Sequence, residues 1–411
     1  MKLAQISALS AAIFMVTSAQ ANAFLDDSSL NLELRNYHMT KGQDDGTNDD
    51  STSQWAQGIR ADFTSGYFEN IVGLDFSAYY SLKLGASHAD LEPGLLKVDS
   101  KGESHSYGKT AYAIKFNLAD MGVAKYGRMF IDTPLLNDSD SRVLPSLSEG
   151  LYADINYGGA SAHTAWVKKA NGRTESGFVD YEADGDSQAV KLIGGAYDFG
   201  NGLSLSADYA TQSDFAKKYL TEATFSTAIE GIDLGFAGQY ANLTKTGAAK
   251  PASGDKSQYA YGLKVSADVG KASFGVAYTK VESTDLGEFG IGWQTAEGNV
   301  NDDDNGYFGY NSIQISDFNS NGQKAWGFNA GYDFNEMVEG LSVEGIYVMG
   351  ETKPQDETEY NLDINYSIPQ VEGLSARLRY AKNTTDYDAS NTKDLVRTDT
   401  RVIIKYEVAV F

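Results

Sequence analysis

The sequence predicts an all-β protein, a transmembrane antiparallel β-barrel of about eighteen strands. Three observations lead to this fold class: an alternation of apolar and polar side chains, the lack of long apolar runs beyond the N-terminus, and a regular series of turn signals. In residues 203–209, Leu, Ala and Tyr alternate with Ser and Asp, and residues 359–368 alternate in the same way. Successive side chains of a strand point to opposite faces, so each segment has one apolar and one polar face. A membrane barrel needs this pattern, because its outer wall meets lipid and its inner wall meets water.

Residues 1–23 have the pattern of a secretory signal peptide. Lys2 precedes a short apolar run, and Ala21, Asn22 and Ala23 form a small-residue cleavage pattern. A transmembrane helix is the alternative, but the run is short and polar residues follow it at once. We therefore expect cleavage after Ala23 and one mature domain over residues 24–411. The chain has no cysteine, which agrees with an exported protein that needs no disulfide framework.

The remaining chain has no stretch of roughly 18 consecutive apolar residues, the length that a helical span needs. A closed barrel is then the one way to cross a membrane with every backbone hydrogen bond satisfied. A soluble β-sandwich is the alternative fold. It would cover its apolar face with a second layer, and so many strands with one apolar face do not favour it.

Turn signals give the strand count. Short connections rich in Gly or Asn are predicted at residues 66–70, 119–122, 157–160, 198–202, 229–232, 268–271, 333–341 and 367–374. Longer polar connections are predicted at residues 39–53, 85–104, 131–148, 170–186, 211–218, 243–256, 282–323, 350–357 and 385–397. Eight short turns and nine long loops imply eighteen strands, with both chain ends on the short-turn side.

The formal net charge of −23 argues against nucleic acid as a partner, because phosphate binding needs basic patches. Acidic side chains cluster in predicted loops, at residues 44–50 and 302–304. We expect these to be solvated loops, and divalent cations that bridge them to anionic lipid heads are the minor alternative. Neither run has the spacing of a calcium-binding loop, so we expect no metal site and no cofactor.

The alternation also assigns the basic side chains to a face. A charge facing lipid at mid-depth would cost roughly 2–4 kcal/mol, so strand cations are expected to point into the lumen. The predicted pore-lining residues are Arg35, Lys83, Lys115, Arg377, Arg379, Arg401 and Lys405. Closure makes the first and last strands neighbours, so five of these should share one patch of wall. The alternative is that these cations merely balance wall carboxylates such as Glu33, Asp363 and Glu407.

Several strings, in order along the chain, resemble the OprD-type outer-membrane porins, a family that includes chitoporin-like members. They include residues 30–37, 62–67, 140–145, 373–380 and 401–406. The resemblance implies an eighteen-stranded barrel whose third long loop folds inward to narrow the lumen, and a ladder of basic residues on one wall. It also implies passage of small solutes, many of which carry a carboxylate.

The constriction loop implied by this resemblance carries Asp132, Asp138, Asp140, Ser141 and Arg142. Its carboxylates should face the basic patch and create a transverse field that orients dipolar solutes. We therefore expect a passive, solute-selective porin of the bacterial outer membrane, monomeric or homotrimeric, with outer-membrane lipid, lipopolysaccharide and small solutes as partners. A channel for chitooligosaccharides or other sugars is the alternative within this class.

The sequence fits two other classes of function less well than it fits a porin. An adhesin-like or structural barrel would need no open lumen and no gathering of cations on one wall. An enzyme is disfavoured, because the four histidines, His38, His88, His105 and His163, stand in no recognisable serine or metal motif.

Aromatic residues of the longest loop could form a sugar-stacking surface, although we favour a role in packing that loop. They are Trp293, Tyr307, Phe308, Tyr310 and Phe318.

Overall fold

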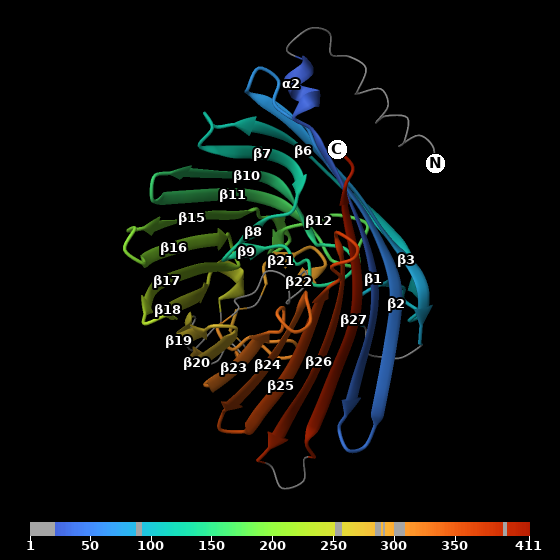
Figure 1. The fold of residues 1–411 in the computed structure, drawn as a ribbon. Helices are drawn as coiled ribbons and strands as arrows, with labels where there is room; N and C mark the ends of the chain where they lie inside the picture. Colours follow the sequence, from blue (N-terminus) through green and yellow to red (C-terminus); the bar gives the residue numbers. More distant parts are fainter. Residues whose placement is uncertain are drawn as a thin grey trace.

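The computed structural model describes residues 21–87, 93–250, 257–283, 289–290, 292–299, 309–388 and 393–411. Within them, one antiparallel sheet of 19 strands includes the two-residue β12 (Val179–Asp180), and the other eighteen strands form a closed barrel (Figure 1). Closure is made by β1 and β27, which pair from Asn31↔Ala409 to Asp44↔Val396. The predicted barrel and its strand number are confirmed.

The eighteen strands of the barrel wall are β1 (Ser29–Asp44), β2 (Asp49–Thr64), β3 (Val72–Ala86), β6 (Tyr107–Asn117), β7 (Gly122–Met129), β10 (Leu147–Tyr157), β11 (Ala160–Asn171), β15 (Val190–Asp198), β16 (Leu203–Gln212), β17 (Ala216–Ile229), β18 (Ile232–Lys245), β19 (Ser257–Val269), β20 (Ala272–Ser283), β23 (Lys324–Asp333), β24 (Leu341–Glu351), β25 (Gln355–Ser367), β26 (Leu374–Tyr387) and β27 (Leu395–Ala409). A short helix, α2 (Ala21–Asp26), precedes β1. It lies on the same side as the C-terminus (Figure 1). No helix among the described residues is long and apolar enough to cross a membrane.

All eight predicted short turns lie between paired strands, as expected. They comprise residues 65–71, 118–121, 158–159, 199–202, 230–231, 270–271, 334–340 and 368–373. The tightest of them show the predicted backbone chemistry: Glu230 and Gly231 have φ values of 51° and 82°. Two consecutive positive φ values are what a two-residue hairpin needs to match the twist of its strands.

The long-loop side differs from the sequence prediction in its boundaries. The first long loop was predicted at residues 39–53, but β1 and β2 continue in pairing until only residues 45–48 remain between them. The loop predicted at 350–357 likewise shrinks to residues 352–354. Polar residues marked these segments as loops. A strand that extends beyond the membrane no longer needs an apolar face, so it can be polar and still pair.

The longer connections carry secondary structure of their own. They hold β4 (Lys97–Val98), β5 (Ser104–His105), β8 (Asp132–Thr133), β9 (Leu136–Asn137), β13 (Glu182–Ala183), β14 (Asp186–Ser187), η1 (Gly247–Ala249), β21 (Gln294–Thr295) and β22 (Gly298–Asn299). A buried cluster joins Ile131 and Leu136 of the third long loop and Trp293 of the longest one to wall residues such as Val167. These loops are therefore packed against the barrel wall.

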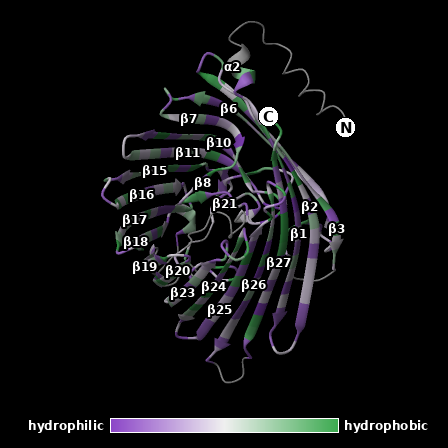
Figure 2. Ribbon diagram, viewed as in Figure 1, coloured by the Kyte–Doolittle hydropathy of each residue, from purple (hydrophilic) through white to green (hydrophobic). Residues whose placement is uncertain are grey.

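The outer face of the barrel is apolar, as the alternation predicts. On β25, Tyr360 and Leu362 are 46% and 40% exposed, whereas Glu359 and Asn361 between them are 0% and 8% exposed. Hydrophobic and hydrophilic bands alternate along the strands in Figure 2. Exposed aromatic and aliphatic side chains on the outside, with polar ones inside, are what a lipid-facing barrel requires.

A charge placed on this outer face should destabilise the barrel. Leu263, at the centre of β19, is 62% exposed. We expect Leu263→Arg to lower the free energy of unfolding in lipid vesicles by about 2–4 kcal/mol. Urea titration of tryptophan fluorescence measures this change. The control is Lys264→Arg at the next position, which lies opposite the buried Ala277. Equal stability of the two variants would show that Leu263 does not face lipid.

Candidate functional site in the barrel lumen

Five basic residues lie on one stretch of the inner wall and are named here the basic track. Closure places Arg35 opposite Lys405, and Arg379 lies opposite Arg401 on the next pair of strands. Arg377 is two residues from Arg379 on β26, so it faces the same side. The structure thus brings together the five cations that the alternation and the closure predicted to be neighbours.

Each cation of the basic track also lies near a wall carboxylate. The pairs are Arg35 with Glu33 at 2.8 Å, Arg377 with Asp363, Arg379 with Asp363 at 3.2 Å, Arg401 with Asp399 at 2.6 Å, and Lys405 with Glu407 at 2.9 Å. Three of these acids are the ones that the charge-balancing alternative named. Proximity of charge alone therefore does not single out a binding residue, and the hydrogen bonds must decide.

Arg379 differs from its neighbours in its hydrogen bonds. Its Nε lies 3.2 Å from Oδ2 of Asp363, yet among the described residues this buried atom makes no hydrogen bond. In contrast, Arg401 donates three hydrogen bonds to the carboxylate of Asp399. The guanidinium of Arg379 is therefore held by its wall carboxylate less completely than that of Arg401 is. Arg379 is the residue of the basic track best prepared to bind an anion.

Two cavities follow the basic track. One of about 340 Å³ has four cations in its lining, Arg35, Arg377, Arg379 and Lys405, and one carboxylate, Asp140. The other, of about 450 Å³, lies toward the long loops and is lined by Lys41, Arg142, Arg173, Arg379, Arg397 and Arg401, with Asp317 and Asp399. Ser141 and Arg379 line both cavities. The local lining is therefore rich in cations although the whole chain is acidic.

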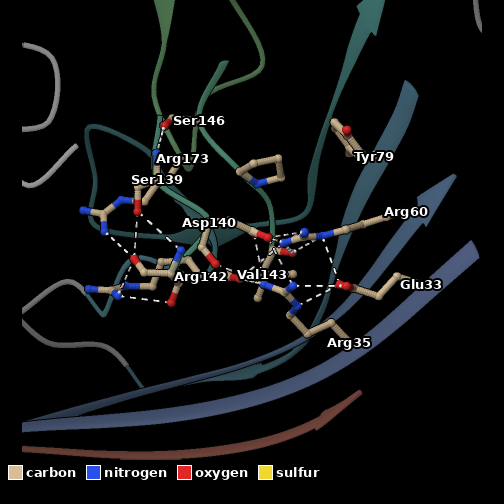
Figure 3. A network of polar contacts seen from close by, with 12 residues as sticks. Glu33, Arg35, Arg60, Tyr79, Ser139, Asp140, Arg142, Val143, Ser146 and Arg173 are labelled. Carbon is tan, nitrogen blue, oxygen red and sulfur yellow. Dashed lines mark hydrogen bonds and ion pairs between the residues drawn. The ribbon is translucent and has the colours of Figure 1, made fainter. Parts of the chain in front are cut away.

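The third long loop is bound to the wall by two arginines (Figure 3). Arg60 of β2 donates to both carboxylate oxygens of Asp140, at 3.0 and 2.6 Å, and to the carbonyl of Val143. Arg35 donates to Asp140 Oδ1 at 3.1 Å and to the carbonyl of Arg142 at 2.7 Å. Bidentate guanidinium pairs are strong and fix geometry, so this contact determines where the loop tip lies.

Arg60 was not among the predicted site residues, although the sequence contains the signal for it. It lies between Ile59 and Ala61 on β2, and Ile59 is 42% exposed on the outer face, so the alternation turns Arg60 inward. Its side chain is buried, and it lies opposite Glu33 across the β1–β2 pair. What the sequence lacked was the path of the loop that carries Asp140.

The other residues predicted for the constriction loop have separate places. Asp138 is buried and accepts hydrogen bonds from Ile131 N–H at 2.8 Å and the Ser148 hydroxyl at 3.2 Å. Its carboxylate closes the base of the loop, whereas we expected it to face the basic track. Asp132 is exposed within β8.

Ser141 and Arg142 lie at the tip of the loop. Arg142 is buried, and burial together with the charges of Arg401 and Arg173 lowers its pKa to about 10. At this pKa the guanidinium stays charged at neutral pH. Ser141 Oγ accepts hydrogen bonds from Arg142 Nη1 and Arg173 Nη1, both at 3.1 Å. The tip therefore adds cationic side chains to the larger cavity, rather than the predominantly acidic face that we expected.

Lys83 and Lys115 line neither cavity along the basic track. Lys83 donates to the carbonyl of Ser104 at 2.9 Å, on the long-loop side. Lys115 is buried, lies 3.1 Å from Asp75 and contacts the ring of Tyr67 at 5.0 Å from its centroid. The alternation predicted their face but not their distance from the site.

A second loop segment, residues 312–317, faces the basic track from the longest loop. Glu359 of β25 accepts hydrogen bonds from the backbone N–H groups of Ile315 and Ser316, both at 2.9 Å. Gln314 donates to the carbonyl of Asp399 at 3.0 Å, and Arg401 donates to the carbonyl of Gln314 at 3.3 Å. The segment is thus fixed to the wall beside the larger cavity.

Among the described loop aromatics, Trp293 and Phe318 are packing residues. Trp293 is 0% exposed, and its indole N–H donates to the carbonyl of Leu135 at 2.9 Å. Phe318 is 2% exposed, and Tyr310 donates its hydroxyl hydrogen to Glu222 at 2.7 Å. Tyr307 and Phe308 lie outside the described residues. The burial of Trp293 and Phe318 favours loop packing over a sugar-stacking surface.

The histidines lie apart from the basic track. His163 lies 2.7 Å from Asp208, and His38 contacts Trp55 edge to face. His105 forms an exposed group with Asp99 and Glu103 on the β4–β5 hairpin, and His88 lies outside the described residues. Neither His163 nor His105 is hydrogen-bonded to a hydroxyl nucleophile among the described residues.

Loss of the bidentate contact should loosen the third long loop. We expect Arg60→Gln to increase the noise of the ionic current through single molecules in a planar bilayer, because Asp140 keeps only Arg35 as a partner. Arg60→Lys keeps the charge and serves as the control for geometry, with an intermediate effect. Currents as quiet as those of the wild type in Arg60→Gln would contradict the anchoring role.

This contact should also be resistant to acid. Burial alone would raise the pKa of Asp140, but the hydrogen bonds and charges of Arg60 and Arg35 outweigh it and hold the pKa below 3.8. Because the pKa of Asp140 is lower in the folded loop than in the unfolded chain, its ionisation stabilises the folded loop at any pH above the unfolded pKa. This stabilisation is lost as the pH falls through the pKa of the folded state. We expect current noise to be unchanged from about pH 7 to about pH 5 and to rise only below about pH 4. Asp140→Asn should be noisy throughout, and a wild-type change near neutral pH would contradict the assignment.

Comparisons with known proteins agree with this architecture. Porin D of Pseudomonas aeruginosa is 26% identical over 430 residues, which cover 97% of this chain and 94% of that protein. Chitoporin of Escherichia coli is 22% identical over 441 residues, which cover 94% and 90%. Among solved structures, P. aeruginosa OccK9 (OpdG) has a TM-score of 0.82 at 23% identity, and OpdK with vanillate from the same species has 0.79 at 22%. Each alignment covers 94% of this chain and 100% of the solved one.

A family model described as outer membrane porin, OprD family, matches residues 22–410, nearly the whole chain. This match confirms the resemblance that the ordered sequence strings indicated, and with the barrel it places the protein in the Gram-negative outer membrane. The chain belongs to the OprD family of outer membrane porins.

Proposed function

We propose that this porin passes small carboxylate-bearing solutes along the basic track, and that Arg379 is the side chain that contacts the solute carboxylate. The observation that carries the proposal is the position of Arg379, which lines both cavities and retains a buried donor without a hydrogen bond among the described residues. A relative with the same fold has been solved with vanillate, which is itself a carboxylate.

A solute enters from the long-loop side, where Arg142, Arg397 and Arg401 line the larger cavity. Its carboxylate exchanges water for guanidinium groups, passes Arg379, and reaches Arg377 and Lys405 in the smaller cavity. The wall carboxylates beside these cations keep each site only moderately attractive. Several moderate sites in series allow a solute to step onward without being trapped.

The narrow part of this path lies between Ser141 of the third long loop and Arg379 of the wall, the two residues that both cavities share. The loop is held there by Asp140 through Arg60 and Arg35. Loop and wall together form a constriction whose polar side is largely guanidinium, which suits a planar carboxylate.

A sugar channel is the weaker candidate. One relative is named chitoporin, but two of the loop aromatics that could stack on sugar rings, Trp293 and Phe318, are buried here. Transport in this proposal is passive and involves no catalytic step and no cofactor. Cleavage of residues 1–23, contact with lipopolysaccharide, and a monomeric or homotrimeric state complete the proposal.

Solute uptake into liposomes tests the role of Arg379. We expect Arg379→Gln to lower the uptake rate of glutamate relative to glucose about tenfold, since one charged hydrogen bond contributes about 1.5 kcal/mol. The control is Lys264→Gln, an inward lysine that lines a separate cavity. If glutamate and glucose were affected equally, the residue would set pore size only. Faster uptake of chitobiose than of glutamate by the wild type would support the sugar channel instead.

A further inference from the structure

The outer face of the barrel also carries cations, and three of them that lie near one another on β11, β15 and β17 lack an acidic partner. Lys168 of β11, Lys191 of β15 and Lys217 of β17 are exposed. None of the three forms an ion pair within the described part of the chain. Lys191 lies opposite Trp166, which is 39% exposed on the outside, and Thr211 lies between Lys191 and Lys217 across neighbouring strands. Partners across a strand pair share a face, so these lysines point away from the lumen.

A cavity of about 170 Å³ opens on this face beside the lysines. Its side walls are Tyr112, Tyr126 and Trp166, which are 49%, 57% and 39% exposed, and its cations are Arg128 and Lys168. Gly127 and Gly150 also line it. A side chain at Gly150 would meet the carbonyl of Trp166 at 2.2 Å, so the close approach of β10 to β11 requires glycine at this position.

Arg128 is oriented within this cavity but retains free donors. Its guanidinium lies over the rings of Phe178 and Tyr112, at 4.3 and 5.3 Å, and its Nε donates to Glu149 at 2.7 Å. Its two Nη groups make no hydrogen bond within the described residues. Stacking and one ion pair therefore fix the plane of the guanidinium, while its outer edge remains available to an anion.

The cations lie next to the long loops. Arg128 is one residue from the end of β7, Lys191 and Lys217 are each the second residue of their strands, and Lys168 is three residues from the end of β11. In outer-membrane barrels the longer loops are extracellular, and aromatic side chains mark the membrane interface. The cavity and the lysines are therefore at the head-group level of the outer leaflet.

We propose that Arg128, Lys168, Lys191 and Lys217 form a binding site for a phosphorylated glycolipid of the outer leaflet, lipopolysaccharide. Its phosphates would contact Arg128 and Lys168 in the cavity and extend to Lys191 and Lys217. Its acyl chains would lie on the apolar face below, where Ile193 is 62% exposed. Glu149 is the one carboxylate in the cavity, and it is neutralised by Arg128.

Two features of the chain support this occupant. Uncompensated outward cations are unexpected on a chain of net charge −23, and the surface of the outer leaflet is rich in phosphate. Two outward lysines elsewhere on the wall, by contrast, are neutralised by the protein: Lys280 pairs with Glu282, and Lys324 lies 3.6 Å from Glu351. The proposal rests on the lipopolysaccharide contact included in the proposed function, and it is independent of the solute that the lumen prefers.

Native mass spectrometry of the purified porin with lipid A tests the site. The variant is Arg128→Gln with Lys168→Gln and Lys191→Gln. We expect the variant to bind bis-phosphorylated lipid A at least about tenfold more weakly than the wild type does. We expect the wild type to bind lipid A without phosphates as weakly as the variant binds bis-phosphorylated lipid A. Equal binding of lipid A by the variant, or equal binding of the dephosphorylated lipid by the wild type, would overturn the proposal.

Two further measurements keep the result specific. The control variant is Lys382→Gln, an outward lysine of β26 opposite the exposed Tyr360, and it should bind lipid A as the wild type does. Phosphatidylglycerol should bind the wild type less tightly than lipid A, and equal affinity would exclude a glycolipid site. Unchanged glutamate uptake in the triple variant verifies that the barrel is folded, and it separates this site from the basic track.

Discussion

The pairing of β1 with β27 is the constraint on which the rest of the structure depends. This pairing leaves no open sheet edge within the membrane. The backbone N–H and C=O groups of an open edge would have no hydrogen-bond partner in the hydrocarbon region, because no water is present there. The pairing also fixes a register, with Arg35 opposite Lys405. A slip of one residue would turn every side chain of β27 to the opposite face, and the lumen would lose Arg401 and Lys405 to lipid. Barrel closure and the assembly of the basic track are therefore one event.

The wall carboxylates explain how an acidic chain can carry a cationic path. Buried guanidinium groups without partners would be costly, so each cation of the basic track is placed beside an acid such as Asp363 or Asp399. The pairing is uneven, however. Arg401 donates three hydrogen bonds to Asp399. Arg379 shares Asp363 with Arg377, and its buried Nε makes no hydrogen bond among the described residues. This inequality, rather than the number of cations, distinguishes a residue that can bind a solute from one that holds the wall together.

The sequence was sufficient for everything that depends on neighbours along a strand. The two-residue period and the turn residues predicted eighteen strands, eight short turns and the inward direction of Arg377 and Arg379. It was insufficient where distant segments meet. The contact of Arg60 with Asp140 joins residues 80 positions apart, and it depends on the path of a loop with no periodic pattern. The same limit explains Asp138, whose carboxylate was expected in the lumen but bonds to its own loop.

The alternation of side chains produces one cationic surface in the lumen and one on the outer face, and the two differ in whether protein carboxylates lie beside the cations. Inside, each cation of the basic track lies beside a protein carboxylate, because solutes must pass and a strongly uncompensated site would retain them. Outside, Lys168, Lys191 and Lys217 have no protein partner in the described part of the chain. These side chains can extend to the head-group level, where a permanently bound lipid does not obstruct transport through the lumen. An uncompensated charge is unfavourable in a transport path but suits a stable lipid contact, so the distribution of carboxylates separates the two roles.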